Sequence, residues 1–118
     1  MNRALPSISV VVPAYNERHY LRRCLDSLLV LDYPNERLEI IVVNNHSTDG
    51  TRAIAECYSP AVKVIDEERQ GVVFARIRGV TAARGEIIAF TDADSQVPRG
   101  WLARMLPAFQ DASVVGVG

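Results

Sequence analysis

Two aspartates, Asp92 and Asp94, are the residues whose type and spacing could do chemistry. They flank one alanine in the segment AFTDADSQ, directly after an apolar stretch. Two carboxylates this close repel each other, which raises the pKa of at least one of them unless a cation lies nearby. Mg²⁺ and Mn²⁺ typically combine one or two carboxylates with phosphate oxygens and water. The pair therefore indicates a divalent cation that assists a diphosphate leaving group, although a DxD segment can also be a capping aspartate beside a solvated one.

The segments that must position these aspartates alternate between strands and helices. Continuous β-branched runs predict buried strands at 8–13, 38–44, 62–66, 86–92 and 113–118. Apolar residues at helical spacing predict helices at 17–31, 51–58, 72–85 and 98–109. We expect Asn16 to cap the first helix, Gly85 to end the third and Pro98 to begin the fourth. This order predicts an α/β fold with an open, mostly parallel sheet and helices on both faces.

The composition limits the class of protein. With 118 residues, 48% of them hydrophobic and 23% charged, the chain is long enough and apolar enough for one folded domain. A net charge of −1 argues against nucleic acid as a partner. No apolar run approaches the roughly 18 residues that span a bilayer. Without a CxxC pair or a Cys/His cluster, Cys24 and Cys57 are expected to be reduced, buried thiols of a cytoplasmic protein.

Polar residues follow the predicted strands, where open α/β sheets bind their ligands. After the first strand come Ala14, Tyr15 and Asn16, and after the second a run of amides and hydroxyls from Asn44 to Ser47. These amides are also good turn and cap residues, and Glu67–Glu68 is expected to be a solvated loop. Neither GxGxxG nor GxxxxGK[ST] is present, which excludes a P-loop and argues against a dinucleotide site.

Five segments carry a family resemblance. SVVVPAYNE, LEIIVVNNHSTDGT, QGVVFARIRG, AARGEIIAFTDAD and VPRGWL resemble, in order and spacing, the family 2 glycosyltransferases of the Rossmann-like GT-A fold. The resemblance covers the chain from residue 8 to about 118. It implies inverting transfer of a sugar from a nucleotide diphosphate donor to an acceptor hydroxyl, with Mn²⁺ or Mg²⁺ at the DAD segment.

The resemblance also implies a nucleotide-binding side of the site. Tyr15 lies where the family's first loop meets the base, and Pro13 and Ala14 shape that loop. Asn44 and Asn45 stand where the family commonly has an acidic residue that reads the base or ribose. The Asn45 oxygen could still accept a uracil N3–H, although without the strength of a charged acceptor, which leaves the identity of the base open. A UDP-sugar is the expected donor.

On the diphosphate side, Arg76 matches a family arginine, while Ile77 replaces a frequent asparagine. Arg76 and Arg78 diverge by about 200° on a helix, so only Arg76 is expected to face the site. Asp92 and Asp94 match the metal motif, with Asp94 the expected direct ligand. Trp101 is expected to anchor the last helix.

The family's general base lies well downstream of the DAD segment, and no part of this chain matches that region. We do not assign the role to Asp111, which falls in an ordinary turn. We therefore expect residues 1–118 to be a truncated, N-terminal donor-binding part that lacks the acceptor half and is inactive alone. The acceptor, a glycan, lipid or other hydroxyl, is open. An unpaired sheet edge predicts self-association, which sedimentation at high concentration would test.

Two alternatives stay open. A non-catalytic nucleotide- or sugar-binding module on the same fold would fit the Asn44–Asn45 pair and the missing base, and it would bind without metal. A nucleotidyltransferase or a phosphatase is the other, but PAYN after the first strand is a poor match to either. Family members often carry transmembrane helices elsewhere, so attachment to the inner face of a membrane through other segments is compatible with this sequence.

Overall fold

A four-stranded sheet forms the centre of the computed structural model, which describes residues 5–109. The strands are β1 (Ile8–Ala14), β2 (Leu38–Asn44), β3 (Lys63–Asp66) and β4 (Ile87–Phe90). Their order is β3-β2-β1-β4 and every pairing is parallel. The predicted open parallel sheet is thus confirmed, while the strand expected at 113–118 lies outside the described residues.

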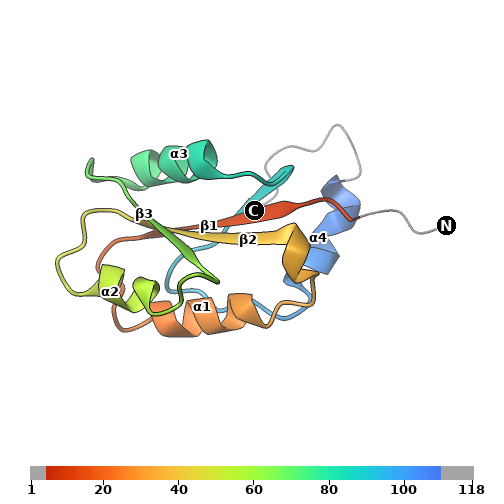
Figure 1. Cartoon of the computed structure of the whole chain (residues 1–118), viewed down its shortest axis with the longest axis horizontal. Helices are drawn as coiled ribbons and strands as arrows, with labels where there is room; N and C mark the ends of the chain where they lie inside the picture. The colour runs from red at the N-terminus through yellow and green to blue at the C-terminus, as the bar shows by residue number, and fades with distance from the viewer. Residues whose placement is uncertain (1–4, 110–118) are drawn as a thin grey trace.

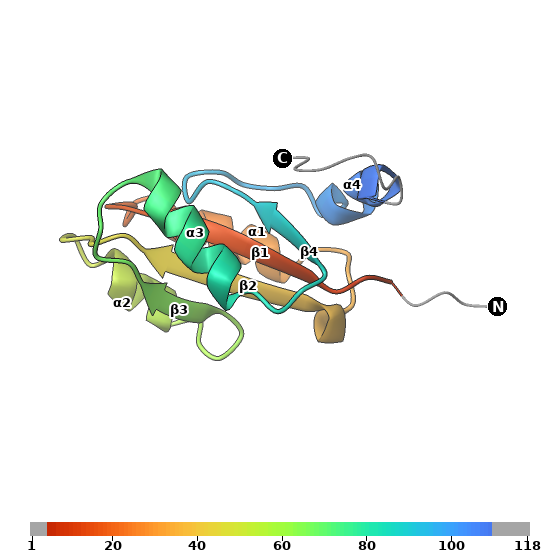
Figure 2. The ribbon, with the colours of Figure 1, turned by 90° about the horizontal axis from the view of Figure 1, so that it is seen from above.

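The helices cover both faces of the sheet. They are α1 (Leu21–Leu29), α2 (Thr51–Glu56), α3 (Val72–Ala82) and α4 (Trp101–Phe109), with a 3₁₀ turn, η1 (Asn35–Arg37), before β2. Figure 1 shows α1 and α2 on one face and α3 on the other, and Figure 2 shows α3 lying over the strands. The chain moves from β1 to β3 in one direction and then returns to β4 beyond β1. Because crossovers are right-handed, this reversal places α3 on the opposite face.

Both faces of β1 and β2 are buried, which explains their uninterrupted apolar sequences. On one face, Leu21, Leu25 and Leu28 of α1 pack in the larger core cluster. On the other face, α3 presents small residues to the strands. A Cβ added at Gly79 would lie 2.3 Å from Cγ1 of Val11. The helix therefore lies very close to the sheet.

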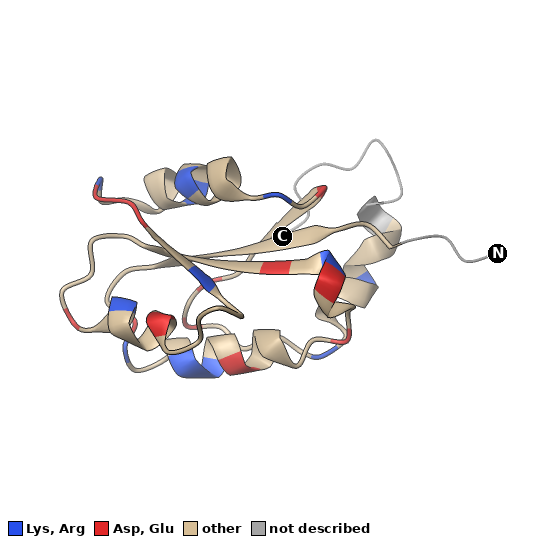
Figure 3. Cartoon of the chain, viewed as in Figure 1, with Lys and Arg blue, Asp and Glu red and all other residues tan. Residues whose placement is uncertain are grey.

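The outer side of α3 is apolar and basic. Val73 is 61% exposed, Ile77 53% and Val80 43%. Figure 3 shows only basic charged residues on this helix, and these are Arg76 and Arg78. Its large apolar side chains thus point away from the sheet, the reverse of an ordinary amphipathic helix.

Three predicted helix boundaries are wrong. Helix α1 begins at Leu21, and the side-chain oxygen of Asn16 accepts the N–H of Thr48 at 2.9 Å instead of capping it. Helix α3 ends at Ala82, and Gly85 instead lies against β1, where a Cβ would come within 2.5 Å of the Ser9 nitrogen. Helix α4 begins at Trp101, whose N–H donates to the carbonyl of Pro98.

The cysteine prediction is half right. Cys24 is buried in α1, as expected, but Cys57 is exposed after the last turn of α2. Among residues 5–109, no helix is both long enough and apolar enough to cross a membrane.

Candidate functional site

Three strands end in register. Ala14 pairs with Asn44, and Asn44 pairs with Asp66. Beyond β4, the chain continues through Asp92 and Asp94. Parallel pairing therefore gathers the polar residues singled out from the sequence at the carboxyl edge of the sheet, where the strands end.

A cavity of about 490 Å³ opens at this edge. Four of the residues that line it were assigned to nucleotide binding from the sequence, and these are Pro13, Ala14, Tyr15 and Asn45. The other lining residues are Gln70, Gly71 and Val72. Tyr15 is 50% exposed, so its ring is available to a ligand. Its contact with a base stays a prediction.

Hydrogen bonds tie the loop after β1 to the loop after β2. The N–H of Asn16 donates to Oγ of Ser47 at 3.0 Å, and the N–H of Ser47 donates to Oδ1 of Asn44 at 3.3 Å. Asn16 has a φ of 51°, a left-handed conformation that asparagine tolerates better than most residues. On the other side of Tyr15, the carbonyl of Ala14 accepts the N–H of Asn45 at 2.8 Å, so the backbone is held both before and after Tyr15.

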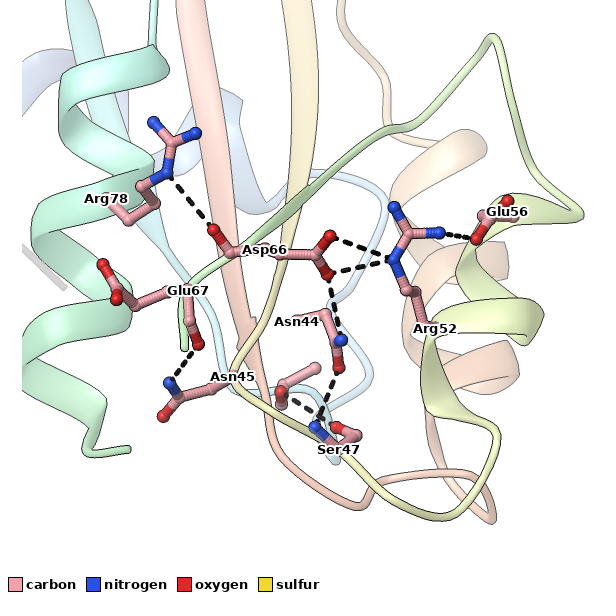
Figure 4. A network of polar contacts seen from close by, with 9 residues as sticks. Asn44, Asn45, Ser47, Arg52, Glu56, Asp66, Glu67 and Arg78 are labelled. Carbon is pink, nitrogen blue, oxygen red and sulfur yellow. Dashed lines mark hydrogen bonds and ion pairs between the residues drawn. The ribbon is translucent and has the colours of Figure 1, made fainter. Parts of the chain in front are cut away.

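A charged network braces the ends of β2 and β3 (Figure 4). Asp66 accepts from Nδ2 of Asn44 at 3.1 Å and from Nε of Arg52 at 2.9 Å, and Arg52 also pairs with Glu56. The Arg52 hydrogen bond is the main reason that the pKa of Asp66 lies below its usual value. Arg78 donates its Nε to the carbonyl of Asp66 at 3.3 Å. The contacts of Asp66 and Arg78 thus help to hold the ends of β2 and β3 together.

A second cavity of about 370 Å³ contains Arg76 and Asp92. The guanidinium carbon of Arg76 lies 5.7 Å from the centre of the Phe90 ring. Val72 of the first cavity and Arg76 of the second are four residues apart on α3, so they share one side of that helix. Trp101 also lines this second cavity, and it packs against the core as expected for an anchor.

The DAD segment is held by its central alanine. Ala93 is 2% exposed and belongs to the core, whereas Asp92 and Asp94 on either side are exposed. The carbonyl of Asp92 accepts from Sγ of Cys24 at 3.5 Å and from the N–H of Ser95 at 3.0 Å. Burial, followed by the charges of Asp94 and Asp92, raises the pKa of Cys24 to about 12, so its thiol stays protonated and can donate. Alanine between the aspartates therefore anchors the loop and directs both carboxylates outward.

Glu17 adds a third carboxylate to this region. Burial, then the charges of Asp94, Asp49 and Asp92, raises its pKa above the usual value. The region is consequently rich in negative charge. A divalent cation would relieve this repulsion.

The donor set fits Mn²⁺ or Mg²⁺ bound together with a diphosphate. Among residues 5–109, no three His, Cys, Asp or Glu side chains are grouped so that they could hold a metal alone. Two exposed carboxylates with open positions suit a cation that completes its coordination with phosphate oxygens and water. Asp92 and Asp94 are the residues that would hold it.

Several lining residues were not singled out from the sequence. Gln70, Gly71 and Val72 line the first cavity, and Glu17 lies near the aspartates. The sequence held one signal for Gly71, a glycine directly before a predicted helix. The structure explains this glycine, because its φ of +137° is one that side chains rarely adopt. Sequence reasoning also misplaced Glu67, which is buried and ion-paired with Arg69 instead of solvated.

Known proteins resemble this chain in sequence or in structure. AglE of Haloferax volcanii, named a glycosyltransferase, is 36% identical over 122 aligned residues that take in 100% of this chain and 40% of AglE. The crystal structure of S. aureus TarS in complex with UDP superposes with a TM-score of 0.81 at 31% identity, covering 91% of this chain and 33% of that one. The mannosyltransferase PcManGT from Pyrobaculum calidifontis, in complex with GDP-Man and Mn²⁺, gives a TM-score of 0.86 at 34% identity, with 92% and 34% covered.

These comparisons agree on the fold and on the class of protein. The chain spans between about a third and two fifths of the length of these proteins. The solved structures are glycosyltransferases of the GT-A type, as the sequence predicted. The sequence model of the family described as Glycosyl transferase family 2 matches residues 9–118. The chain therefore belongs to glycosyl transferase family 2.

Proposed function

We propose that residues 1–118 are the donor-binding part of an inverting glycosyltransferase and bind a nucleotide diphosphate sugar with Mn²⁺ or Mg²⁺. The supporting observation is the placement of two cavities at the carboxyl edge of the sheet, one lined by Tyr15 and Asn45 and the other by Arg76 and Asp92. TarS with UDP and PcManGT with GDP-Man and Mn²⁺ are complexes of the same chemical class.

On this proposal, each residue has a role that is consistent with its position. Pro13, Ala14 and Tyr15 would form the wall against which the base packs, because aromatic faces stack on nucleobases. Arg76 would place a positive charge against the diphosphate. Asp92 and Asp94 would hold the cation, which when bound neutralises charge on the leaving diphosphate.

The general base and the acceptor walls are, on this proposal, supplied by sequence beyond these 118 residues. The acceptor class stays open among glycans, lipids and other hydroxyl compounds. A UDP-sugar is the proposed donor, and the base preference is one result of the experiment below.

Calorimetric titration of UDP, GDP and dTDP, with and without Mn²⁺, tests the donor site. We expect one nucleotide to bind only with Mn²⁺, and Asp94→Ala to weaken it about tenfold or more through loss of a charged contact. Asp92→Ala should act in the same direction. Asp32→Asn, an exposed acid between α1 and η1, is the matched control and should bind as the wild type does.

Two outcomes would change the proposal. Absence of binding by a chain that circular dichroism shows to be folded would overturn it. Tight binding that is indifferent to Mn²⁺ and to both aspartate variants would instead favour the non-catalytic nucleotide-binding module.

A further inference from the structure

The side chain of Asn45 is buried and almost fully used by protein contacts. It is 4% exposed. Its Nδ2 donates to the carbonyl of Glu67 at 3.0 Å and to the carbonyl of Arg69 at 2.7 Å. Its Oδ1 accepts the N–H of Gly71 at 2.9 Å. Both N–H donors of the amide are therefore used within the protein, and the oxygen that would accept a uracil N3–H is buried and already accepts from Gly71.

All three contacts lead to one loop, residues 67–71, which connects β3 to α3. Figure 4 shows Asn45 at the end of β2 facing Glu67 across the strand ends. Gln70 and Gly71 of this loop line the 490 Å³ cavity. The loop is thus a wall of the proposed nucleotide site, and Asn45 is the side chain that joins it to the sheet.

The loop has a second fastening on its other side. Oε2 of Glu67 accepts from the backbone N–H of Arg69 at 3.0 Å, and Oε1 accepts from Nη2 of Arg69 at 3.0 Å. The Arg69 guanidinium carbon also lies 4.6 Å from the centre of the Phe74 ring on α3. Neither Glu67 nor Arg69 lines the cavity, so this fastening can be weakened without touching a ligand.

We propose that Asn45 is a positioning residue, which holds residues 67–71 as a wall of the nucleotide cavity and does not read the base. This inference rests on the proposed donor site. It reverses the change in nucleotide affinity that is expected for Asn45→Asp. A base-reading residue would gain a charged acceptor and bind uridine nucleotides more tightly. If Asn45 is a positioning residue, Asn45→Asp would instead place a carboxylate against the carbonyl oxygens of Glu67 and Arg69, and residues 67–71 would detach from it.

The test compares Asn45→Asp with Asn35→Asp, the same change at an exposed position of η1. Hydrogen exchange at the Gly71 amide reports the loop, and titration of UDP, GDP and dTDP reports the cavity. We expect Asn45→Asp at pH 7.5 to speed Gly71 exchange and to weaken every nucleotide that binds by about tenfold, because buried carbonyls lose their donors. As the pH falls, the protonated carboxyl regains one O–H donor, so both effects should shrink.

Glu67→Gln gives a second route that does not depend on the folding of Asn45→Asp. It should speed Gly71 exchange and weaken the same nucleotides without a change in base preference. Tighter UDP binding by Asn45→Asp, or a loss confined to one base with unchanged Gly71 exchange, would overturn the proposal. Exchange needs no nucleotide, so a wild type that binds none would count against the donor site and leave the brace testable.

Discussion

Glu67 shows how one contact changes the chemistry of a residue that the sequence marks as ordinary. The hydrogen bond from the Arg69 side chain, with a second from its backbone N–H, lowers the pKa of Glu67 to about 2. The usual value is 4.5. Because protonation is harder in the folded state, the carboxylate stabilises the fold above pH 4.5 and loses this effect as the pH falls toward 2.

Replacement of Glu67 by glutamine should therefore change how the free energy of unfolding depends on pH in the acid range. We expect the free energy of unfolding of the wild type to fall between pH 4.5 and pH 2, and that of Glu67→Gln to fall less over this window. Urea denaturation at several pH values measures both. Glu68→Gln, at the exposed neighbouring position, is the control and should keep the wild-type slope; an unchanged slope in Glu67→Gln would contradict the assignment.

At the scale of elements, α3 is the helix that connects the two cavities. It packs on β1 and β2 through Ala75 and Gly79, and this close packing leaves Val73, Ile77 and Val80 outside. Val72 and Arg76 then lie along the edge of the sheet, one in each cavity. The packing of α3 on the sheet thus positions the residues that this helix contributes to both cavities.

Gly79→Ala should push α3 away from β1. Alanine favours a helix over glycine by about 1 kcal/mol, but its Cβ would lie 2.3 Å from Val11 Cγ1 and 3.2 Å from Val43 Cγ2. Overpacking of this kind costs about 1–3 kcal/mol, so a net loss of stability is expected. Chemical denaturation measures it. Gly100→Ala is the control, since its Cβ would meet only Nε of Arg104 at 3.8 Å, and a stabilised Gly79→Ala protein would disprove the close packing.

At the scale of the whole molecule, the site lies along one edge of the sheet. Two cavities and the DAD carboxylates are present, and on the proposed function the family's general base is not among these residues. Inverting transfer needs such a base to deprotonate the acceptor hydroxyl. This chain should therefore bind the nucleotide without catalysing sugar transfer.

We expect the 118-residue chain to bind nucleotide and yet transfer no sugar. Release of nucleoside diphosphate from UDP- and GDP-sugars, with Mn²⁺ and mixed glycan and lipid acceptors, is the measurement. The Asp94→Ala protein sets the background rate. Metal-dependent release well above that background would show that a base and an acceptor site are present after all.

Much of the fold was predictable because burial leaves a sequence pattern. Strands β1 and β2 are covered on both faces, so their sequences are continuous apolar runs, and DAD after β4 was recognisable from its like charges. Helix ends were not predictable in the same way. Asn16 is of a residue type that often caps helices, but its side-chain oxygen accepts the N–H of Thr48, which lies 32 residues further along the chain. Such competition between local and distant partners leaves no local pattern.

The sequence by itself determined the α/β class, the family and the residues that gather at the strand ends. Those features follow from periodic burial and from residue types, which are properties of short segments. Only the tertiary structure decided which partners the polar side chains have. Asn45 faces the 67–71 loop instead of open solvent because β2 and β3 lie side by side and end in register, bringing its amide within 3.0 Å of the Glu67 carbonyl. Hydrogen bonds depend on such distances, and distances between residues far apart in the chain exist only once it has folded.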